Sequence, residues 1–263
     1  MLIIFTDLDG TLLNENYSFK EARPALKLLK KKRVPLIFCT SKTRAEVQVY
    51  QKRMKLKEPF IVENGGAIFI PKNYFDFKFK YDKIVDSFFV IELGARYKKL
   101  IKALRIVEKK TDSKIIGFNQ MSAKELAKDC GLSLKEAKLA KKREYVEPFK
   151  IIKGSINKIS KEINKQGFNY TRSARYHYIV HDNDKGRAIN ALINLFKKKY
   201  GKATSVGIGD NFNDIPMFKS VDKSFLVKTY NGKYDKSLKN LKNIKKINGT
   251  GPAGWNKAIK SLV

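Results

Sequence analysis

Short uninterrupted runs of apolar residues recur along the chain, and they predict buried β-strands. The clearest runs are residues 2–5 and 34–39 and the apolar centres of residues 205–209 and 224–228. A strand that is apolar on both faces is typical of a parallel sheet covered by helices on each side. Between these runs, apolar residues recur at helical spacing, as they do in residues 185–200. The pattern therefore predicts an α/β protein whose core is a parallel sheet.

The middle of the chain has a different organisation, because short strand patterns alternate there with lysine-rich helix patterns. Ser122, for example, precedes a glutamate by three residues, which is a capping box at a helix start. We expect a core domain of residues 1–81 and 177–263 and an inserted α+β domain of residues 82–176. In this arrangement residues 176–181 form a strand that returns to the core. The expected strands of the insertion are residues 88–92, 114–117, 149–153 and 169–172.

The first apolar run ends at two carboxylates, Asp7 and Asp9, which Gly10 and Thr11 follow. The C-terminal end of a parallel strand is the usual place for a site in an open α/β sheet. Carboxylates this close need a cation or a shared proton to coexist, and a hard divalent cation such as Mg²⁺ meets that need. One carboxylate can then attack phosphorus while the other handles the proton. An Asx-capped turn is the plain structural alternative for the same residues.

Polar residues also follow two later strand patterns. The second apolar run ends at Thr40, and Thr43 with a glutamate three residues later forms a capping box that starts a helix. Further on, Asn64 and Gly65 lie between two short apolar runs, and Asn-Gly is a strong signal for a tight hairpin turn. These turns place polar side chains beside the predicted parallel sheet.

The charge of the chain is unusual, because 56 lysines and arginines face only 25 acidic residues, for a net charge of +31. One reading is a nucleic-acid-binding protein. The other is a lysine bias spread over the whole surface. We favour the second, because the lysines are not confined to one arm or face and far outnumber the arginines. We therefore expect no specific nucleic-acid partner, although a positive field would attract an anionic substrate.

The remaining composition is that of an ordinary globular protein. Cys39 and Cys130 lie far apart and suggest no disulfide framework. No apolar run approaches the ~20 residues that a membrane helix needs, and the first residues form a strand pattern without the features of a signal peptide. These features predict a cytoplasmic protein without a membrane partner, either a monomer or a homodimer.

Taken in order, four polar motifs resemble those of the haloacid dehalogenase (HAD) superfamily of phosphohydrolases with a type C2 cap. The motifs contain Asp7, Thr40, Lys185 and Asp210, the last within Gly-Asp-Asn-Phe-Asn-Asp. The resemblance implies an α/β fold: a three-layer, Rossmann-like parallel-sheet core with an inserted α+β cap. Closure of such a cap would exclude water from the reaction and select the leaving group.

The resemblance also implies catalytic roles. Asp7 would be the nucleophile and Asp9 the general acid and base. Thr40, with Ser41 as the alternative, would hydrogen-bond the transferring phosphoryl group. Lys185 would neutralise charge on the nucleophile and on the phosphoryl oxygens.

A magnesium site follows from the same resemblance. Mg²⁺ would lie between the Asp7 carboxylate, the Asp9 backbone carbonyl and Asp210. Asn211 and Asp214 would support the metal, in part through water. Mg²⁺ is therefore the expected cofactor.

Further substrate contacts are implied at Lys42, at the turn of Asn64 and Gly65, and in the cap at Arg143 and His177. Arg143 could pair with a carboxylate or phosphate as a planar fork. For Asn64, a role in the turn alone is an equal alternative. For His177, the equal alternative is a strand residue whose ring forms its hydrogen bonds within the sheet.

Three segments resemble one branch of the superfamily in particular, the mannosyl-3-phosphoglycerate phosphatases. They are residues 143–149, 173–177 and 249–256. The branch implies hydrolysis of mannosyl-3-phosphoglycerate, a phosphorylated sugar-glycerate, to mannosylglycerate and phosphate through an aspartyl-phosphate. Three alternatives stay open: a HAD phosphatase for another sugar phosphate such as glucosyl-3-phosphoglycerate, a phosphomutase, or a basic nucleic-acid-binding protein on a HAD scaffold.

Overall fold

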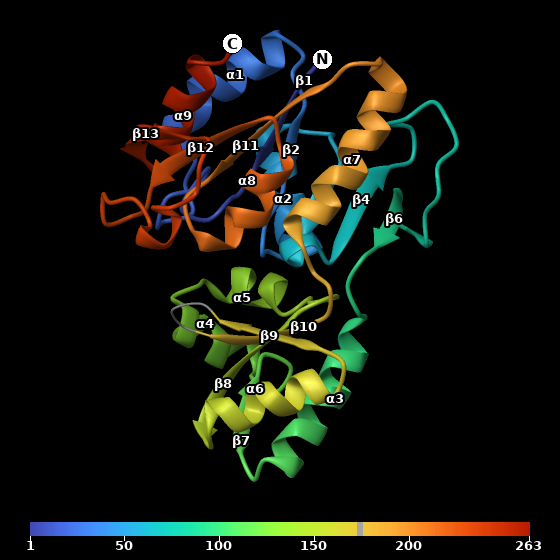
Figure 1. Cartoon of the computed structure of the whole chain (residues 1–263), viewed down its shortest axis with the longest axis vertical. Helices are drawn as coiled ribbons and strands as arrows, with labels where there is room; N and C mark the ends of the chain where they lie inside the picture. The colour runs from blue at the N-terminus through green and yellow to red at the C-terminus, as the bar shows by residue number, and fades with distance from the viewer. Residues whose placement is uncertain (173–175) are drawn as a thin grey trace. The chain divides into compact units, whose positions relative to one another are not determined.

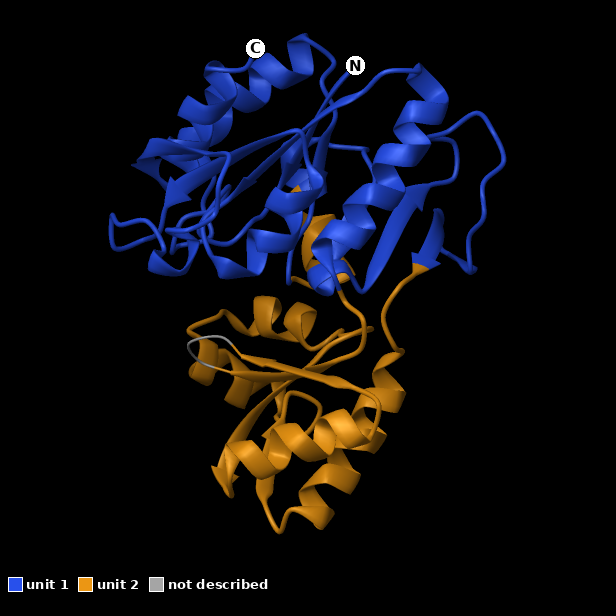
Figure 2. Ribbon diagram, viewed as in Figure 1, with its two compact units in different colours: residues 1–41, 51–91, 184–263 blue, residues 42–50, 92–183 orange. Residues whose placement is uncertain are grey.

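A computed structural model of the chain describes residues 1–172 and 176–263, which fall into two compact units. The first unit contains residues 1–41, 51–91 and 184–263, and the second contains residues 42–50 and 92–183 (Figure 2). The domain limits expected from the sequence, at residues 81 and 177, stay a prediction. Within the described ranges, no helix combines the length and the apolar character needed to cross a membrane.

A five-stranded parallel sheet forms the centre of the first unit. Its strands and the helices around it are β1 (Leu2–Thr6), α1 (Arg23–Lys31), β2 (Leu36–Phe38), α7 (Lys185–Tyr200), β11 (Thr204–Gly209), α8 (Ile215–Ser220), β12 (Lys223–Lys228), β13 (Ile244–Thr250) and α9 (Gly251–Lys260). The limit between the two units falls within α2 (Arg44–Met54). The strand order is β13-β12-β11-β1-β2. α1 packs beside α9 on one face and α7 beside α8 on the other (Figure 1). The expected three-layer α/β core is therefore confirmed.

β1 lies inside this sheet because its side chains are apolar toward both helix layers. Ile3, Ile4 and Phe5 have no exposed surface. The strand pairs in parallel with β11, with Leu2 opposite Thr204, and with β2 on its other side. Strands in this position carry their loops to one edge of the sheet, so residues after β1 and β11 meet there.

The C-terminal part of the sheet differs from the expectation. Residues 224–228 are the last strand that the apolar pattern predicts, but β13 follows and pairs in parallel with β12. This prediction was wrong because β13 has no apolar run: Ile247 is buried, whereas Lys245 and Lys246 are exposed. Lysines on an outermost strand also discourage pairing with another chain.

A second, smaller sheet of the first unit has the strand order β3-β4-β6-β5. Its strands are β3 (Phe60–Val62), β4 (Ala67–Pro71), β5 (Lys83–Val85) and β6 (Phe88–Glu92). β3 and β4 form the expected hairpin, with Phe60 opposite Phe69. Their connection is the short 3₁₀ turn η2 (Glu63–Gly65). A parallel bridge between Cys39 and Ile61 joins this sheet to the end of β2.

The second unit is an antiparallel sheet with helices packed on it. Its elements are α3 (Tyr97–Lys110), β7 (Lys114–Gly117), α4 (Ala123–Cys130), α5 (Leu134–Ala140), β8 (Glu147–Lys153), α6 (Ile156–Lys165), β9 (Asn169–Arg172) and β10 (His177–Val180), with the strand order β7-β8-β10-β9. Leu100 of α3, Phe149 of β8 and Ile163 of α6 belong to one buried cluster. The capping box predicted at Ser122 is present at the start of α4, and Ser133 forms another at the start of α5.

β10 corrects one expectation from the sequence. Residues 176–181 were predicted to return to the core sheet, but β10 pairs with β8 and with β9. The reason is that Ile179 has no exposed surface and packs into the cluster formed by α3, β8 and α6. An apolar strand pattern does not reveal which of two sheets the strand joins.

Candidate active site

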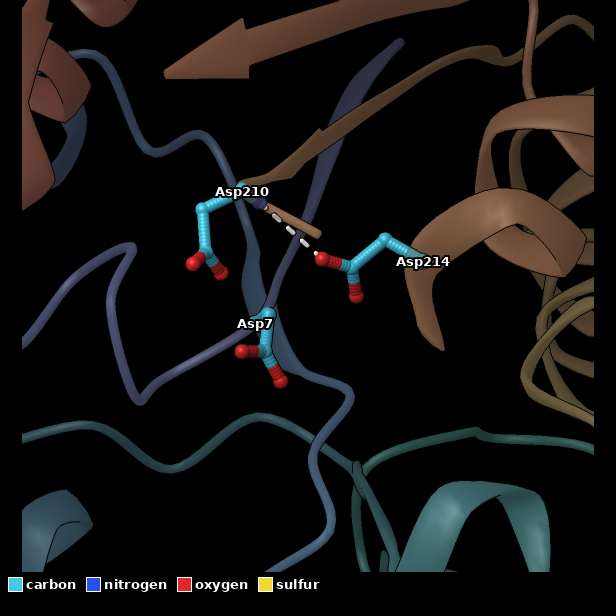
Figure 3. Close-up of side chains that lie close together, drawn as sticks. All are labelled: Asp7, Asp210 and Asp214. Atoms are coloured by element: carbon cyan, nitrogen blue, oxygen red, sulfur yellow. Dashed lines mark hydrogen bonds between the residues drawn. The ribbon is translucent and has the colours of Figure 1, made fainter. Parts of the chain in front are cut away.

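Three buried carboxylates, Asp7, Asp210 and Asp214, lie together in the first unit (Figure 3). One oxygen of each lies within 4.8 Å of the others. Asp7 directly follows β1 and Asp210 directly follows β11, so the parallel pairing of these strands brings the two side chains to one edge. Asp214 ends the 3₁₀ turn η3 (Phe212–Asp214). Its Oδ2 accepts hydrogen bonds from the amides of Asp210 (3.0 Å) and Asn211 (3.4 Å).

Lys185 places a buried ammonium between two of these carboxylates. Its Nζ donates to Asp7 Oδ1 at 2.9 Å and to Asp214 Oδ1 at 2.7 Å. Burial by itself would lower the pKa of Lys185, but the charges of Asp214 and Asp7 outweigh burial and raise that pKa. Lys185 is therefore a cation at neutral pH. It is the first residue of α7, whose N-cap Asp184 accepts from the Arg187 amide at 3.0 Å.

The turn η2 packs directly against the start of α7. Gly65 has a φ of +92°, and a Cβ at this position would lie 2.2 Å from the Asp184 carbonyl oxygen. Only glycine permits this approach, so Gly65 helps to place Lys185. Asn64, with a φ of +57°, fits the turn role. Its Oδ1 is buried and has no hydrogen-bond donor among the described residues, so its substrate contact stays a prediction.

The electrostatics of the cluster favour a cation. Burial, together with the charges of Asp214 and Asp9, raises the pKa of Asp7 to about 7 against the opposing effect of Lys185. Burial, then the charges of Asp214 and Asp7, raises the pKa of Asp210 well above its usual value. Carboxylate oxygens are the ligands that hard divalent cations prefer. These residues therefore fit a divalent cation, which would offset the negative charge that Lys185 alone leaves uncompensated.

The loop after Asp9 folds back onto Asp210. Thr11 Oγ1 donates to Asp210 Oδ1 at 3.0 Å, and Asn211 Nδ2 donates to the same oxygen at 3.1 Å. Gly10 has a φ of +81°, and a Cβ there would lie 2.4 Å from Asp210 Oδ2. Asn211 thus supports Asp210 through its side chain. The contact of Thr11 was not predicted, although Thr11 belongs to the motif that drew attention to Asp7.

Thr40 and Ser41 lie at the end of β2 in the same unit. Thr40 is fully buried; its amide donates to the Ile61 carbonyl at 3.2 Å and its carbonyl accepts from the Asn64 amide at 2.9 Å. Ser41 is half-buried. These contacts link the end of β2 to the hairpin turn, and the contact of either hydroxyl with a phosphoryl group stays a prediction.

A hydrogen-bonded chain from α9 supports the residue before the nucleophile candidate. Trp255 is fully buried, and its Nε1 donates to Thr6 Oγ1 at 3.0 Å. Thr6 Oγ1 in turn donates to the Asp7 carbonyl at 2.8 Å. Only a family resemblance drew attention to the segment of Trp255, so sequence analysis missed this positioning role.

Tyr230 is a second residue that sequence analysis missed. Its side chain is 45% exposed. Burial of its inner part, with the charges of Asp9 and Asp210, raises the pKa of its hydroxyl. Tyr230 therefore presents a neutral hydroxyl near the carboxylates. Tyr230 lies in a stretch rich in lysine and asparagine that also contains Tyr234, and nothing in this stretch distinguishes Tyr230 as a site residue.

Lys42 and Arg143, two predicted substrate contacts, belong to the second unit and meet at Glu46. Lys42 Nζ lies 3.5 Å from Glu46 Oε1. Burial would raise the pKa of Glu46, but the charges of Lys42 and Arg143 and hydrogen bonds from Thr43 outweigh it and lower that pKa. Arg143 Nε also donates to the Ala140 carbonyl at 3.0 Å. The contacts of Lys42 and Arg143 with a substrate stay predictions.

His177 has a partner within its own sheet. Its Nδ1 shares a hydrogen bond of 2.7 Å with the Tyr170 hydroxyl, and its ring lies 5.5 Å from that of Phe149. This contact fits the alternative of a satisfied strand histidine, and a substrate contact of His177 stays a prediction. Of the family-like segment 173–177, residues 173–175 lie outside the described residues.

Glu147 of β8 is a fully buried carboxylate in the second unit. It accepts hydrogen bonds from the Tyr97 hydroxyl and, at 3.0 Å, from the Asn119 amide. Burial raises the pKa of Glu147 to about 7, against the opposing effects of these hydrogen bonds and of Arg143. A carboxyl whose folded pKa is raised supports stability at low pH, and that stability is lost as pH rises through the folded pKa.

We expect Glu147→Gln to remove this pH dependence. Between pH 5.5 and 8.5 the original protein should lose about 2 kcal/mol more unfolding free energy than the variant. Urea unfolding at both pH values measures the change in unfolding free energy between them. Any hydrogen bond that the variant loses at both pH values cancels in this change. Glu125→Gln is the matched control, because the pKa of exposed Glu125 is lowered by hydrogen bonds from Ser122. An equal pH dependence in all three proteins would contradict the prediction.

Comparisons with known proteins agree with this architecture. The family model of haloacid dehalogenase-like hydrolases matches residues 4–245. A glucosyl-3-phosphoglycerate/mannosyl-3-phosphoglycerate phosphatase of Methanococcoides burtonii is 47% identical over 264 residues, 99% of this chain and 97% of that protein. A mannosyl-3-phosphoglycerate phosphatase of Pyrococcus horikoshii is 39% identical over 226 residues, 86% of this chain and 90% of that protein.

A solved structure shares the fold at low sequence identity. A haloacid dehalogenase-like hydrolase from Bacteroides thetaiotaomicron matches with a TM-score of 0.70 and 17% identity over 99% of both chains. The resemblance seen in the motifs of Asp7 and Asp210, to the HAD superfamily and to its mannosyl-3-phosphoglycerate branch, is thus confirmed. From its motifs, its fold and these relatives, the chain belongs to the haloacid dehalogenase-like hydrolase family.

Proposed function

We propose that this protein is a Mg²⁺-dependent phosphatase that hydrolyses mannosyl-3-phosphoglycerate to mannosylglycerate and phosphate. The observation that carries the proposal is the buried set of Asp7, Asp210 and Asp214 with Lys185 between two of them. Glucosyl-3-phosphoglycerate is a second substrate candidate. It is favoured because a relative that matches 99% of this chain is named for both esters.

The first half of the proposed reaction uses both carboxylates of the first motif. An oxygen of Asp7 attacks the phosphorus of the ester in line with the leaving oxygen, and Asp9 donates a proton to that oxygen. The P–O bond of the ester breaks as the P–O bond to Asp7 forms, which gives an aspartyl-phosphate. Lys185, whose Nζ lies 2.9 Å from Asp7 Oδ1, is proposed to stabilise negative charge on the phosphoryl oxygens.

The second half returns the enzyme to its starting state. Asp9, now deprotonated, accepts a proton from a water molecule, which attacks the phosphorus of the aspartyl-phosphate. Phosphate leaves and the Asp7 carboxylate is restored. Thr40, with Ser41 as the alternative, is proposed to hold a phosphoryl oxygen through its hydroxyl. Arg143, Lys42 and His177 remain the proposed contacts of the glycerate and sugar groups.

Asp7, Asp210 and the backbone carbonyl of Asp9 are the proposed Mg²⁺ ligands, with Asn211 and Asp214 in support. When bound, Mg²⁺ supplies positive charge that lowers the repulsion between the Asp7 carboxylate and the phosphoryl oxygens. Gly10 and Thr11 keep the Asp210 carboxylate in place through close packing and a hydrogen bond of 3.0 Å.

Phosphate release from a panel of esters tests the proposal. The panel contains mannosyl- and glucosyl-3-phosphoglycerate, simple hexose phosphates and an aryl phosphate, each with Mg²⁺ or with EDTA. We expect Mg²⁺-dependent turnover of the two glycerate esters, with the highest kcat/KM among the panel. Activity spread evenly over hexose phosphates would retain the chemistry and reject the substrate. Failure to turn over any ester in folded, metal-loaded protein would reject the phosphatase and favour a mutase or a binding protein.

Binding of Mg²⁺ should depend on pH, because the raised pKa values of Asp7 and Asp210 mean that protons compete with the cation. Mg²⁺ at about 100 times its dissociation constant should raise the melting temperature by roughly 5–10 °C at pH 8 and clearly less at pH 5.5. Differential scanning calorimetry measures both shifts. Asp210→Asn, the control, should lose most of the response at pH 8. An equal Mg²⁺ response at both pH values would contradict the assigned ligands.

A further inference from the structure

A large groove lies in the first unit, away from the carboxylates. Its volume is about 900 Å³, within the range of small-molecule sites. Met1 and Pro35, which line it, stand just before β1 and β2, whereas Asp7 stands just after β1. The groove and the candidate active site are thus at opposite ends of the same parallel strands. The groove is lined further by α1, by the segment after α2, and by Tyr74 and Tyr200.

The charged residues at the groove are almost all cationic. Glu58 is the one carboxylate among the described lining residues. The seven cations of the lining are Arg23, Lys27, Lys30, Arg33, Arg53, Lys55 and Lys57. Lys27, Lys30 and Arg33 are exposed, and no carboxylate of the described residues forms an ion pair with them. The groove therefore suits a ligand with several negative charges.

The floor of the groove is apolar and aromatic. Leu29 and Leu36 are buried beneath it, and Phe19 lies under the guanidinium groups of Arg23 and Arg53, 5.8 and 5.2 Å from its ring centre. Tyr200 stacks on Phe196 with ring centres 6.2 Å apart and keeps 45% of its side chain exposed. The ring of Tyr200 thus packs on Phe196, while Tyr200 remains accessible to a ligand.

We propose that this groove binds a small organic polyanion that carries an aromatic ring, such as a nucleoside triphosphate. The cationic residues of α1 and of the segment after α2 would hold the phosphates, and the floor with Tyr200 would hold the base. A spread of surface lysines alone would give neither the aromatic floor nor a groove of this volume. This site is independent of the proposed phosphatase activity, because none of its lining residues belongs to the carboxylate cluster.

Equilibrium binding of ATP, measured by calorimetry in EDTA and about 0.15 M salt, tests the site. EDTA removes the cation that could hold ATP at the carboxylates, and the salt screens weak surface attraction. Lys27→Glu/Lys30→Glu should weaken ATP binding about tenfold or more. Lys31→Glu/Lys32→Glu is the matched control. It changes the net charge equally in the same part of the chain, but neither residue lines the groove.

The aromatic part of the proposal has its own test. Tyr200→Leu should weaken ATP binding about fivefold or more and leave the binding of inorganic triphosphate unchanged. Equal losses of affinity in the two lysine double variants would identify general surface attraction and overturn the site. Absence of ATP binding to the original protein would overturn it as well. Equal affinity for ATP and inorganic triphosphate would show that the base does not contribute to binding, and it would overturn the proposal that the ligand carries an aromatic ring. Circular dichroism of each variant establishes that it is folded.

Discussion

Asp7→Asn is expected to reduce phosphate release by about 10⁴-fold or more. An amide is a poor nucleophile toward phosphorus, so no aspartyl-phosphate can form at this position. The change is close to isosteric, and the Asn carbonyl oxygen can still accept from Lys185 Nζ, which lies 2.9 Å from Asp7 Oδ1. The variant should therefore fold. Its loss should fall on kcat, as measured by single-turnover phosphate release with the best ester of the panel.

Asp76→Asn is the control for this experiment, because Asp76 lies in the same unit and its side chain is 77% exposed. It should leave kcat unchanged. A second readout is labelling with radioactive phosphate from the ester during turnover, which should appear on the original protein and be absent from Asp7→Asn. Turnover of the asparagine variant within tenfold of the original rate would remove Asp7 from the role of nucleophile.

Lys185→Met is expected to affect stability as well as activity. Removal of the ammonium leaves Asp7 and Asp214 buried without their shared cation, which should cost about 3–5 kcal/mol of unfolding free energy in EDTA at pH 8. The cost should be smaller at pH 5.5. Asp7 has a pKa of about 7 even with Lys185 present, so it takes up a proton as pH falls. Phosphate release should also fall by at least about 10²-fold, because one charged donor to the phosphoryl group is lost.

Lys199→Met is the matched control on the same helix, α7. Lys199 Nζ donates to the Tyr74 carbonyl at 3.0 Å and lies 3.7 Å from the exposed carboxylate of Asp76. Its removal therefore leaves no buried carboxylate without a cation, and an ion pair with an exposed partner contributes about 0–1 kcal/mol. Urea unfolding of both variants at pH 5.5 and pH 8, with EDTA or with Mg²⁺, gives the comparison. If Lys185→Met cost no more than Lys199→Met at pH 8, Lys185 would not be the ammonium that compensates the buried carboxylates.

The central part of the site could be predicted because each residue follows a strand that the apolar pattern reveals. β1 is an apolar run and β11 combines apolar residues with glycines, so the sequence predicts that Asp7 and Asp210 stand at strand ends in a parallel sheet. Lys185 could be predicted because a capping aspartate and an amphipathic helix mark its position at a helix start. At these residues the strand and helix patterns of the sequence agree with the packing of the folded protein, as they do where a sequence strongly specifies one structure.

Other features could not be predicted, because they depend on partners that are remote in the sequence. β13 is buried only at Ile247, and its pairing with β12 decides its conformation. Trp255 contacts Thr6 across 249 positions of the chain. β10 joins the sheet of the second unit through Ile179, a choice that its own residues do not encode. Tyr230 gains its position only when its loop lies beside Asp9 and Asp210.

The pairing of β1 also sets the order in which the two units can form during protein synthesis. Leu2 of β1 pairs with Thr204 of β11, and Trp255 reaches Thr6. β1 can pair with β2 early, but a ribosome must release residues beyond 204 before β1 gains its second partner, β11. It must release residues beyond 255 before Trp255 of α9 can donate its hydrogen bond to Thr6. Residues 92–183 carry nearly all of the second unit and can pack soon after they emerge. Growing chains should thus present a folded insertion and an incompletely supported catalytic strand until residue 255 has emerged.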